Sequence, residues 1–199
     1  VFDVFFSSCV LVVTAPITGL AALAVRFDSP GPALFRQRRM GLRGSEFDLV
    51  KLRGMYIDAR ERFPELYEYQ DVDPTAIDRF HFHDQEPDPR VTRAGRLLRR
   101  YSIDELPNFW NVLRGDMSVV GPRPEIPDLA ELYGPRLELF LSVKPGVTSP
   151  AKALGRDTLS LEETICMDLD YIQNRTLFTD LKTVVDTALG IFSGSNRST

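Results

Sequence analysis

The sequence predicts an α+β protein that is mostly helical, with one small β-hairpin close to its N-terminal end. Three observations lead to this fold class. Residues 4–25 contain no charged side chain, and about 20 apolar residues are enough for a helix to cross a bilayer core. Two short apolar strands, 33–35 and 47–52, flank a glycine-containing connection at 40–44. The remainder of the chain shows helical spacing and helix-start signals, which predict a helical core.

The apolar segment at 4–25 has more than one interpretation. A signal peptide would begin with basic residues, but this chain begins Val1-Phe2-Asp3. Pro16 removes one backbone hydrogen bond from a helix, and nearby hydroxyl groups could satisfy the backbone groups that it frees. Two alternatives follow: a kinked helix that spans the membrane, or a helix broken at Ala15-Pro16 that enters and leaves on the same face.

The overall composition excludes some functions and leaves others open. A formal net charge of −4 argues against a general nucleic-acid-binding protein. The two cysteines, Cys9 and Cys166, do not form a disulfide framework and fit a reducing compartment. Basic residues dominate 33–56, acidic residues 57–89, and arginines return at 90–114. This order indicates either an anion site built from two basic segments or ordinary surface charge.

The second strand of the hairpin supplies candidate phosphate ligands. Lys51 and Arg53 flank Leu52, so both cations should lie on one face of a strand. Two cations on one face suit a diphosphate. An exposed edge strand carrying Lys and Arg is the alternative.

The middle of the chain combines helices with a long loop. Residues 55–69 show helical spacing, and the acidic segment 71–89 is typical of an exposed loop. Within that segment His81 and His83 share a strand face, but no third metal ligand is evident, so a surface loop is the default interpretation. A helix follows at 92–101, whose arginine stripe is either solvated or an anionic-lipid surface.

Next comes a stretch with two adjacent carboxylates. Ser102 and Glu105 have the spacing of a capping box, which predicts a helix from Ile103 to about Leu113. We expect its buried face to carry Leu106, Phe109, Trp110 and Leu113. On this evidence alone, Asp104 and Glu105 are acids favoured at a helix N-terminus by the helix dipole.

The surroundings of the two carboxylates support a chemical alternative. Arg99 and Arg100 come just before them, and Pro122 and Pro124 fix the backbone on both sides of Arg123. A carboxylate can attack phosphorus to give an acyl phosphate. A second carboxylate can hold Mg²⁺, which screens phosphate oxygens. These residue types together suit phosphoryl transfer.

The last third of the chain predicts further helices. Residues 124–142 form a short helical region, with core positions at Leu129, Leu132, Leu137 and Phe140. Ser160 and Glu163 form a second capping box that opens a helix to about Asn174. Asp168 and Tyr171 share a face of that helix, either as a surface pair or as substrate contacts.

The final helix, beginning at 179–180, has one apolar side that can pack on the core or lie in the membrane interface. That side consists of Leu181, Val184, Val185, Ala188, Leu189 and Phe192. The apolar ending at 188–192 favours the interface.

Two long motifs resemble the bacterial sugar transferase family, the monotopic polyprenyl-phosphate phosphoglycosyltransferases. They are the stretches 99–107 (RRYSIDELP) and 111–124 (NVLRGDMSVVGPRP). Shorter stretches that also resemble the family pattern are Phe2-Asp3, 37–41, 51–55, 88–95 and 144–148.

This resemblance implies a fold and a location. Residues 1–27 would form a re-entrant membrane helix broken at Ala15-Pro16. Residues 28–199 would form a cytoplasmic catalytic domain with amphipathic C-terminal helices in the membrane interface. The resemblance implies a monotopic protein of the bacterial inner membrane that faces the cytoplasm and contacts membrane lipids, and it is compatible with a homo-oligomer.

The resemblance also implies a reaction. Asp104 would attack the β-phosphate of a UDP-sugar and release UMP, and a polyprenyl (undecaprenyl) phosphate would then take the sugar phosphate from the aspartyl intermediate. Asp104 and Glu105 form the catalytic pair and the expected Mg²⁺ ligands. Positions implied to bind phosphate are Lys51, Arg53, Arg99 and Arg123. Pro122 and Pro124 would shape the site.

Some positions depart from the family pattern. Ala15 stands where the pattern has serine before Pro16, and Gly54 stands where it has threonine. The segment Ser149–Lys152 replaces Gly-Trp-Ala-Gln, so the identity of the donor sugar stays open. The basic pair expected before Phe2 is absent, which suggests that the chain begins inside a longer protein. A non-catalytic membrane scaffold and a Mg²⁺-dependent diphosphate hydrolase are the alternatives to a transferase.

Overall fold

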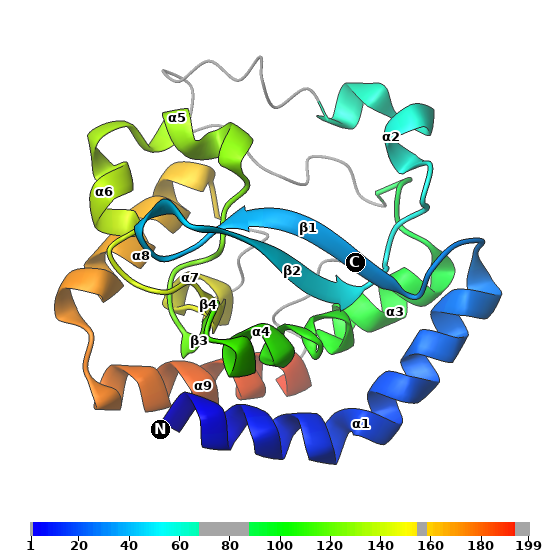
Figure 1. Cartoon of the computed structure of the whole chain (residues 1–199), viewed down its shortest axis with the longest axis horizontal. Helices are drawn as coiled ribbons and strands as arrows, with labels where there is room; N and C mark the ends of the chain where they lie inside the picture. The colour runs from blue at the N-terminus through cyan, green and yellow to red at the C-terminus, as the bar shows by residue number, and fades with distance from the viewer. Residues whose placement is uncertain (1, 68–87, 155–158, 194–199) are drawn as a thin grey trace.

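The computed structural model describes residues 2–67, 88–154 and 159–193 of the chain. Helices surround one antiparallel hairpin and a small parallel strand pair (Figure 1). The elements are α1 (Phe2–Asp28), β1 (Leu34–Met40), β2 (Glu46–Leu52), α2 (Ala59–Arg62), α3 (Arg93–Arg100), the 3₁₀ turn η5 (Ile103–Glu105), α4 (Asn108–Arg114), β3 (Ser118–Val120), α5 (Ala130–Tyr133), α6 (Leu137–Phe140), β4 (Gly146–Thr148), α7 (Pro150–Ala153), α8 (Leu161–Asn174) and α9 (Leu177–Ser193). The predicted mostly helical architecture with a small hairpin is confirmed.

Helix α1 continues through Pro16 but bends part-way along its length (Figure 1). It is long and apolar enough to cross a membrane, judged by length and composition alone. Pro16 has no N–H to offer the carbonyl of Val12, which is a common cause of such a bend. The hydroxyl groups of Ser8 and Thr14 each donate to the carbonyl one turn before them, at 2.8 and 2.7 Å. Neither hydroxyl therefore supplies the bond that Pro16 removes.

Both ends of α1 are fastened to the rest of the protein. At its start, the Asp3 carboxylate accepts hydrogen bonds from the Ser118 hydroxyl at 2.9 Å and from the Val119 N–H at 3.1 Å, both in β3. At its end, the Asp28 carboxylate accepts from the Ala94 N–H at 2.9 Å, in the first turn of α3. The helix therefore lies along the domain instead of projecting from it.

The two strand pairs differ in how far they could be predicted. β1 and β2 pair antiparallel from Leu34 opposite Leu52 to Met40 opposite Glu46, which confirms the hairpin and extends its first strand. β3 and β4 pair in parallel, and they are joined through a connection that contains α5 and α6. This second pair was not predicted.

The hydrophobic core lies between the hairpin, α4, β3 and α8. Its buried members are Phe47, Leu49, Val112, Met117, Val119, Val120, Val143, Tyr171 and Ile172. A smaller cluster joins α1 to α3 and β2, and another joins α5 and α6 to α8. Leu129 and Phe140 are buried, as predicted for the segment 124–142.

Two glycines bring α3 against the end of β2. A Cβ on Gly95 would lie 1.9 Å from the carbonyl oxygen of Gly54, so no side chain fits at position 95. The Thr92 N–H donates to the same Gly54 oxygen at 3.0 Å, and the Thr92 hydroxyl caps α3 by accepting from the Gly95 N–H. This contact fixes the start of α3, the helix that leads to the two adjacent carboxylates.

The helix predicted over 55–69 is wrong in its extent. The described part contains only α2 and a 3₁₀ turn over Pro64–Tyr67. Pro64 cannot donate a helical hydrogen bond, which explains the interruption. The His81 and His83 pair lies outside the described residues.

The capping box predicted at Ser102 is also wrong, whereas the one at Ser160 is confirmed. Ser102 has a φ of 53° and its side chain makes no capping bond. The 3₁₀ turn η5 follows, and α4 begins only after Pro107. At Ser160 the hydroxyl accepts from the Glu163 N–H, and the Glu163 carboxylate accepts from the Ser160 N–H at 2.8 Å.

The buried face predicted for α4 is confirmed only in part: Phe109 packs against the core, but Trp110 does not. Trp110 is 53% exposed, whereas Asn111 is fully buried. The Asn111 side chain accepts from the Val50 N–H at 3.1 Å and donates to the Asp48 carbonyl at 2.8 Å, so it satisfies the backbone of β2. A polar residue can be buried at low cost when its own polar atoms are hydrogen-bonded in this way.

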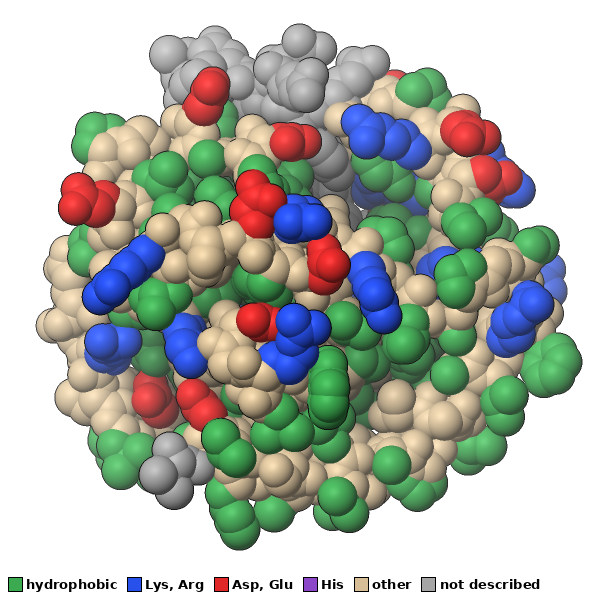
Figure 2. All heavy atoms as spheres, viewed as in Figure 1, with side chains coloured by type: hydrophobic (Ala, Val, Ile, Leu, Met, Phe, Trp, Pro, Cys, Tyr) green, Lys and Arg blue, Asp and Glu red, His purple; other side chains and the backbone are tan. Residues whose placement is uncertain are grey.

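Helix α9 turns its threonines inward and its apolar side outward. Thr183 and Thr187 are buried, and the Thr187 hydroxyl lies 2.6 Å from that of Thr148 in β4. Exposed apolar side chains on α9 include Leu177, Phe178, Leu181, Val185 and Leu189. α1 and α9 both lie along the lower side of the molecule in Figure 1, and apolar side chains line the same edge in Figure 2.

Candidate active site

A small pocket opens where β2, η5 and the β4–α7 segment meet. Charged side chains on its wall include Arg39, Lys51, Glu105, Arg123 and Lys152. The structure therefore brings together residues from four separate parts of the sequence around one cavity.

Asp104 lies buried beside this pocket, with 8% of its surface exposed. Burial is the main cause that raises the pKa of its carboxyl group above 3.8, and the Glu105 carboxylate raises it further. The cations that oppose this rise are Lys51, Arg99 and Lys152. An ionised carboxylate here is poorly hydrated and surrounded by cations, which suits a nucleophile directed at a phosphate.

Glu105 faces the opposite wall of the pocket. The Lys152 ammonium donates to Glu105 Oε2 and to the Val147 carbonyl, the latter at 2.9 Å. Glu105 was predicted to complete a capping box with Ser102, but it instead forms an ion pair with a residue distant in the sequence. The only sequence signal for Lys152 was the departure from the family pattern at Ser149–Lys152.

Lys51 presents its ammonium to the two carboxylates from β2. Burial lowers its pKa from 10.5 to about 8, although the negative charges of Glu105 and Asp104 oppose the change. Part of its surface reaches the pocket, but protein atoms surround the side chain densely. A lysine that is charged at neutral pH and partly desolvated is well suited to bind phosphate oxygens.

Arg123 is held in place by a buried carboxylate from α8. Its backbone N–H donates to Asp168 Oδ2 at 3.0 Å, and its guanidinium lies 3.4 Å from Glu125. Between Pro122 and Pro124 the backbone has little freedom, and the carbonyls of these prolines accept from the Gly146 N–H and the Arg39 side chain. Asp168 was predicted only as part of a surface pair or substrate contact, but it is 1% exposed and positions this turn.

Replacing Asp168 with asparagine should change how stability depends on pH. Burial raises the pKa of Asp168 from 3.8 to about 7. A raised acid pKa means that the folded state holds the proton more tightly, so stability falls as pH rises from about 4 to 7. Asparagine cannot ionise, so the variant lacks this loss. From pH 4 to pH 8, we expect the free energy of unfolding of the wild type to fall by roughly 2–4 kcal/mol relative to that of Asp168→Asn.

Urea unfolding of the detergent-solubilised protein at several pH values would measure this effect. Asp170→Asn is the matched control, because Asp170 is exposed on the same helix. Parallel stability curves for the wild type and Asp168→Asn would contradict the assigned pKa.

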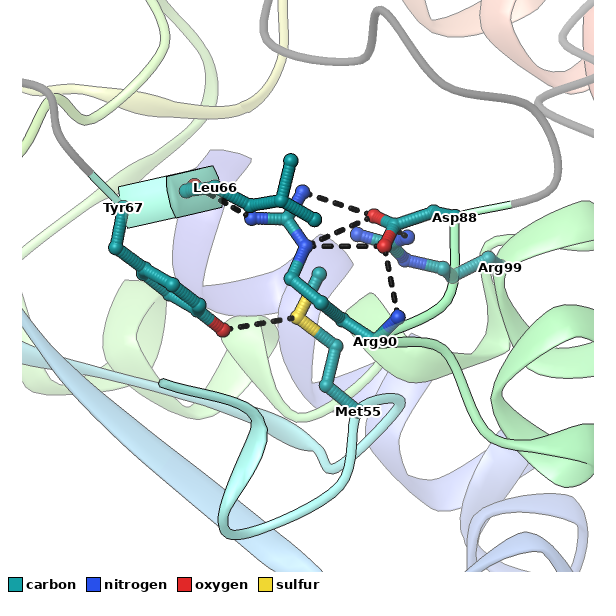
Figure 3. Close-up of polar contacts among 6 residues, drawn as sticks. All are labelled: Met55, Leu66, Tyr67, Asp88, Arg90 and Arg99. Atoms are coloured by element: carbon teal, nitrogen blue, oxygen red, sulfur yellow. Dashed lines mark hydrogen bonds and ion pairs between the residues drawn. The ribbon is translucent and has the colours of Figure 1, made fainter. Parts of the chain in front are cut away.

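Arg99, at the end of α3, acts electrostatically on Asp104, and its side chain lies beside Asp88 (Figure 3). Its guanidinium lies 4.0 Å from the Asp88 carboxylate. That carboxylate also accepts from Arg90 at 2.9 and 3.0 Å, and Arg90 donates to the Leu66 carbonyl at 3.0 Å. Although burial raises the pKa of Asp88, the bonds from Arg90 lower it overall, so Asp88 stays ionised.

Arg53 was expected to lie beside Lys51 on one strand face and to bind phosphate, but it is not among the residues that line the pocket. Its backbone N–H donates to the Ala33 carbonyl at 2.8 Å, just beyond the last pair of β1 and β2. The Arg53 guanidinium donates to the Ser29 hydroxyl at 2.7 Å, the Ser29 carbonyl at 2.9 Å and the Pro32 carbonyl at 2.8 Å. These contacts assign Arg53 to the turn after α1, and we do not include it in the proposed site.

Residues 1–194 match the family profile described as bacterial sugar transferase. The chain belongs to this family. It is 40% identical to a UDP-glucose:undecaprenyl-phosphate glucose-1-phosphate transferase of Caulobacter vibrioides, over 98% of this chain and 70% of that protein. It is 36% identical to the exopolysaccharide production protein ExoY of Rhizobium meliloti, over 94% of this chain and 81% of that protein. A glucose-1-phosphate transferase of Escherichia coli K12 is 36% identical over 96% of this chain, which spans 39% of that longer relative.

The carboxylates of this family member fit a magnesium ion that is shared with a substrate. Within residues 2–67, 88–154 and 159–193, no cluster of three or more metal-ligating side chains occurs. Asp104 and Glu105 provide adjacent carboxylates, and Mg²⁺ is commonly held by one or two carboxylates together with substrate phosphates. The donor set therefore suits Mg²⁺ bound with a diphosphate better than a cation held by protein alone.

Proposed function

We propose that this chain transfers a sugar-1-phosphate from a UDP-sugar to polyprenyl (undecaprenyl) phosphate and so begins the assembly of a lipid-linked glycan. The observation that carries the proposal is the buried Asp104 next to Glu105, faced by Lys51, Lys152 and Arg99 at the edge of a pocket. Phosphate-binding cations and a desolvated carboxylate are the groups that phosphoryl transfer needs. The names of the related proteins support the same donor and acceptor classes.

The proposed reaction has two displacements at one phosphorus atom. A carboxylate oxygen of Asp104 attacks the β-phosphorus, the bond from that phosphorus to the bridging oxygen breaks, and UMP leaves with this oxygen. A phosphate oxygen of the polyprenyl phosphate then attacks the same phosphorus. The bond to Asp104 breaks, which frees the carboxylate and gives a polyprenyl-diphosphate-linked sugar. Lys51 and Arg123 would bind the phosphate oxygens throughout.

Mg²⁺ held by Asp104 and Glu105 would neutralise charge on the phosphate oxygens when it is bound. Arg99, aligned by Asp88, would balance the charge of the Asp104 carboxylate before donor arrives. Pro122 and Pro124 would hold the backbone that presents Arg123.

We further propose that residues 1–27 lie in the membrane without spanning it and that residues 28–199 form a catalytic domain on the cytoplasmic face of the bacterial inner membrane. Asp3 and Asp28 bind the same folded domain at opposite ends of α1. A spanning helix would place these two ends on opposite sides of the bilayer. The exposed apolar side chains of α1, α9 and Trp110 would contact lipid.

Cysteine labelling should find both ends of α1 on one side of the membrane. We would replace Cys9 and Cys166 with serine and place single cysteines at Phe2 or Arg26. We expect a membrane-impermeant maleimide to label both positions in inverted inner-membrane vesicles and neither in intact spheroplasts. A separate Cys9→Ser protein keeps the native Cys166, which is exposed on α8, and marks the catalytic-domain side as a control. Labelling of the two positions from opposite sides would show a spanning helix.

UMP release from a panel of UDP-sugars tests the activity itself. We expect release that is sustained only when polyprenyl phosphate and Mg²⁺ are present, together with formation of a lipid-linked sugar. A non-catalytic scaffold would release no UMP with any donor. A diphosphate hydrolase would turn over many times without lipid acceptor.

A further inference from the structure

The Lys152–Glu105 contact joins two walls of the pocket. Both side chains are only 16% exposed, so neither is free in solvent. The ammonium is also held by the Val147 carbonyl at 2.9 Å, at the end of β4. The backbone N–H of Lys152 donates to the Ser149 hydroxyl, which caps α7. The position of this cation is therefore set by the β4–α7 turn, and the cation in turn fixes the Glu105 carboxylate.

The charges around the pocket are unequal in number. The two carboxylates, Asp104 and Glu105, are outnumbered by the nearby cations Arg39, Lys51, Arg99, Arg123 and Lys152. Each of these cations repels a divalent ion that approaches the carboxylates, and the repulsion is strong where water is scarce. Lys152 has the most direct effect, because its ammonium occupies Oε2, an oxygen that a metal ion would otherwise use.

We infer that Lys152 is a positioning residue that acts through Glu105 and keeps the affinity of the catalytic pair for a divalent cation low until a phosphate substrate enters. The inference rests on the proposed function, because it concerns the same Asp104–Glu105 pair. The phosphates of the donor bring the negative charge that offsets Lys152, so cation and donor bind together.

Titration with Mn²⁺ alone, followed by the electron paramagnetic resonance signal of the free ion, tests this role on the full chain in detergent. Lys152→Gln removes the charge and keeps a polar side chain. We expect it to bind Mn²⁺ on the order of tenfold more tightly than the wild type. Lys152→Arg keeps the charge and should bind Mn²⁺ as weakly as the wild type does. Lys182→Gln is the matched control: it removes a lysine paired with Asp186 on α9, and we expect no change in Mn²⁺ affinity.

A double-mutant comparison separates an effect through Glu105 from a general structural change. In a Glu105→Gln background, adding Lys152→Gln should raise Mn²⁺ affinity by clearly less than tenfold, because the carboxylate that Lys152 contacts is gone and only its weaker repulsion near Asp104 remains. A tenfold gain in that background would overturn the inference. Equal affinity of Lys152→Gln and wild type, or no measurable binding by Lys152→Gln at millimolar Mn²⁺, would also overturn it.

The same samples keep this inference apart from the proposed function. UMP release is measured in parallel with the Mn²⁺ titration. If the wild type releases UMP in a lipid-dependent manner but Lys152→Gln does not bind Mn²⁺ more tightly, only the role of Lys152 fails. If the wild type releases no UMP from any donor, the proposed transferase fails, whatever the Mn²⁺ affinities are. Thermal unfolding of each variant verifies that the titrated protein is folded.

Discussion

Asp104→Asn should reduce UMP release from the preferred UDP-sugar by at least about 1,000-fold, because an amide cannot form the acyl-phosphate bond. The substitution preserves shape, and Asp104 is buried with a raised pKa. Removing a charge from that environment should leave the folding stability unchanged or slightly higher. The measurements are the rate of UMP release with polyprenyl phosphate present and the unfolding midpoint of the same sample.

A control variant and a second measurement strengthen this test. Asp128→Asn makes the same chemical change at an exposed position, and it should keep full activity. Incubation of the wild type with donor but without lipid acceptor should give protein whose mass is increased by one phosphosugar. The Asp104→Asn variant should lack this increase. Equal UMP release by wild type and Asp104→Asn would remove Asp104 as the nucleophile.

Local sequence signals predicted those parts of the fold that local interactions determine. The hairpin followed from two apolar strands around a glycine-containing turn, and both strands are present. The capping box at Ser160 needs only a hydroxyl and a carboxylate at the right spacing, and both of its bonds form. The parallel pairing of β3 with β4 could not be predicted in this way, because each strand has three residues and a long connection separates them.

Tertiary contacts explain the local predictions that failed. Ser102 and Glu105 have the same spacing as Ser160 and Glu163, but the left-handed conformation of Ser102 turns its side chain away from a capping bond. Glu105 instead pairs with Lys152. In α4 the polar residue Asn111 is buried because the β2 backbone needs its amide, a requirement that apolar periodicity does not reveal.

The candidate site was predictable where its residues are consecutive and hidden where they are distant. The motif around Asp104 and Glu105 identified the carboxylates, and the structure brings Lys51 and Arg123 to the same pocket. Lys152 reaches the site from α7 and Asp168 supports it from α8. No local pattern links either residue to the carboxylates, so only the folded chain shows their relation.

Arg53→Met should be the most destabilising of the substitutions considered, lowering the free energy of unfolding by roughly 3–5 kcal/mol. Arg53 is 4% exposed, and its guanidinium bonds to Ser29 and Pro32 at distances of 2.7 to 2.9 Å. Methionine fills much of the space but leaves these buried oxygens without donors. Urea unfolding followed by the fluorescence of Trp110, the single tryptophan, would measure the loss.

Arg38→Met provides the comparison, because Arg38 is an exposed arginine of the same hairpin that pairs with Glu46 and Asp48. Surface ion pairs of this kind contribute about 0–1 kcal/mol, so the change should be small.

The two possible roles of Arg53 give opposite patterns. If it anchors the turn after α1, stability falls and the KM for the UDP-sugar, measured well below the unfolding midpoint, stays within about twofold. If it binds phosphate, as the family resemblance implies, KM rises about tenfold or more while stability is retained. The contacts with Ser29 and Pro32 favour the first pattern, because a guanidinium that already bonds to four protein oxygens has little capacity left for a substrate.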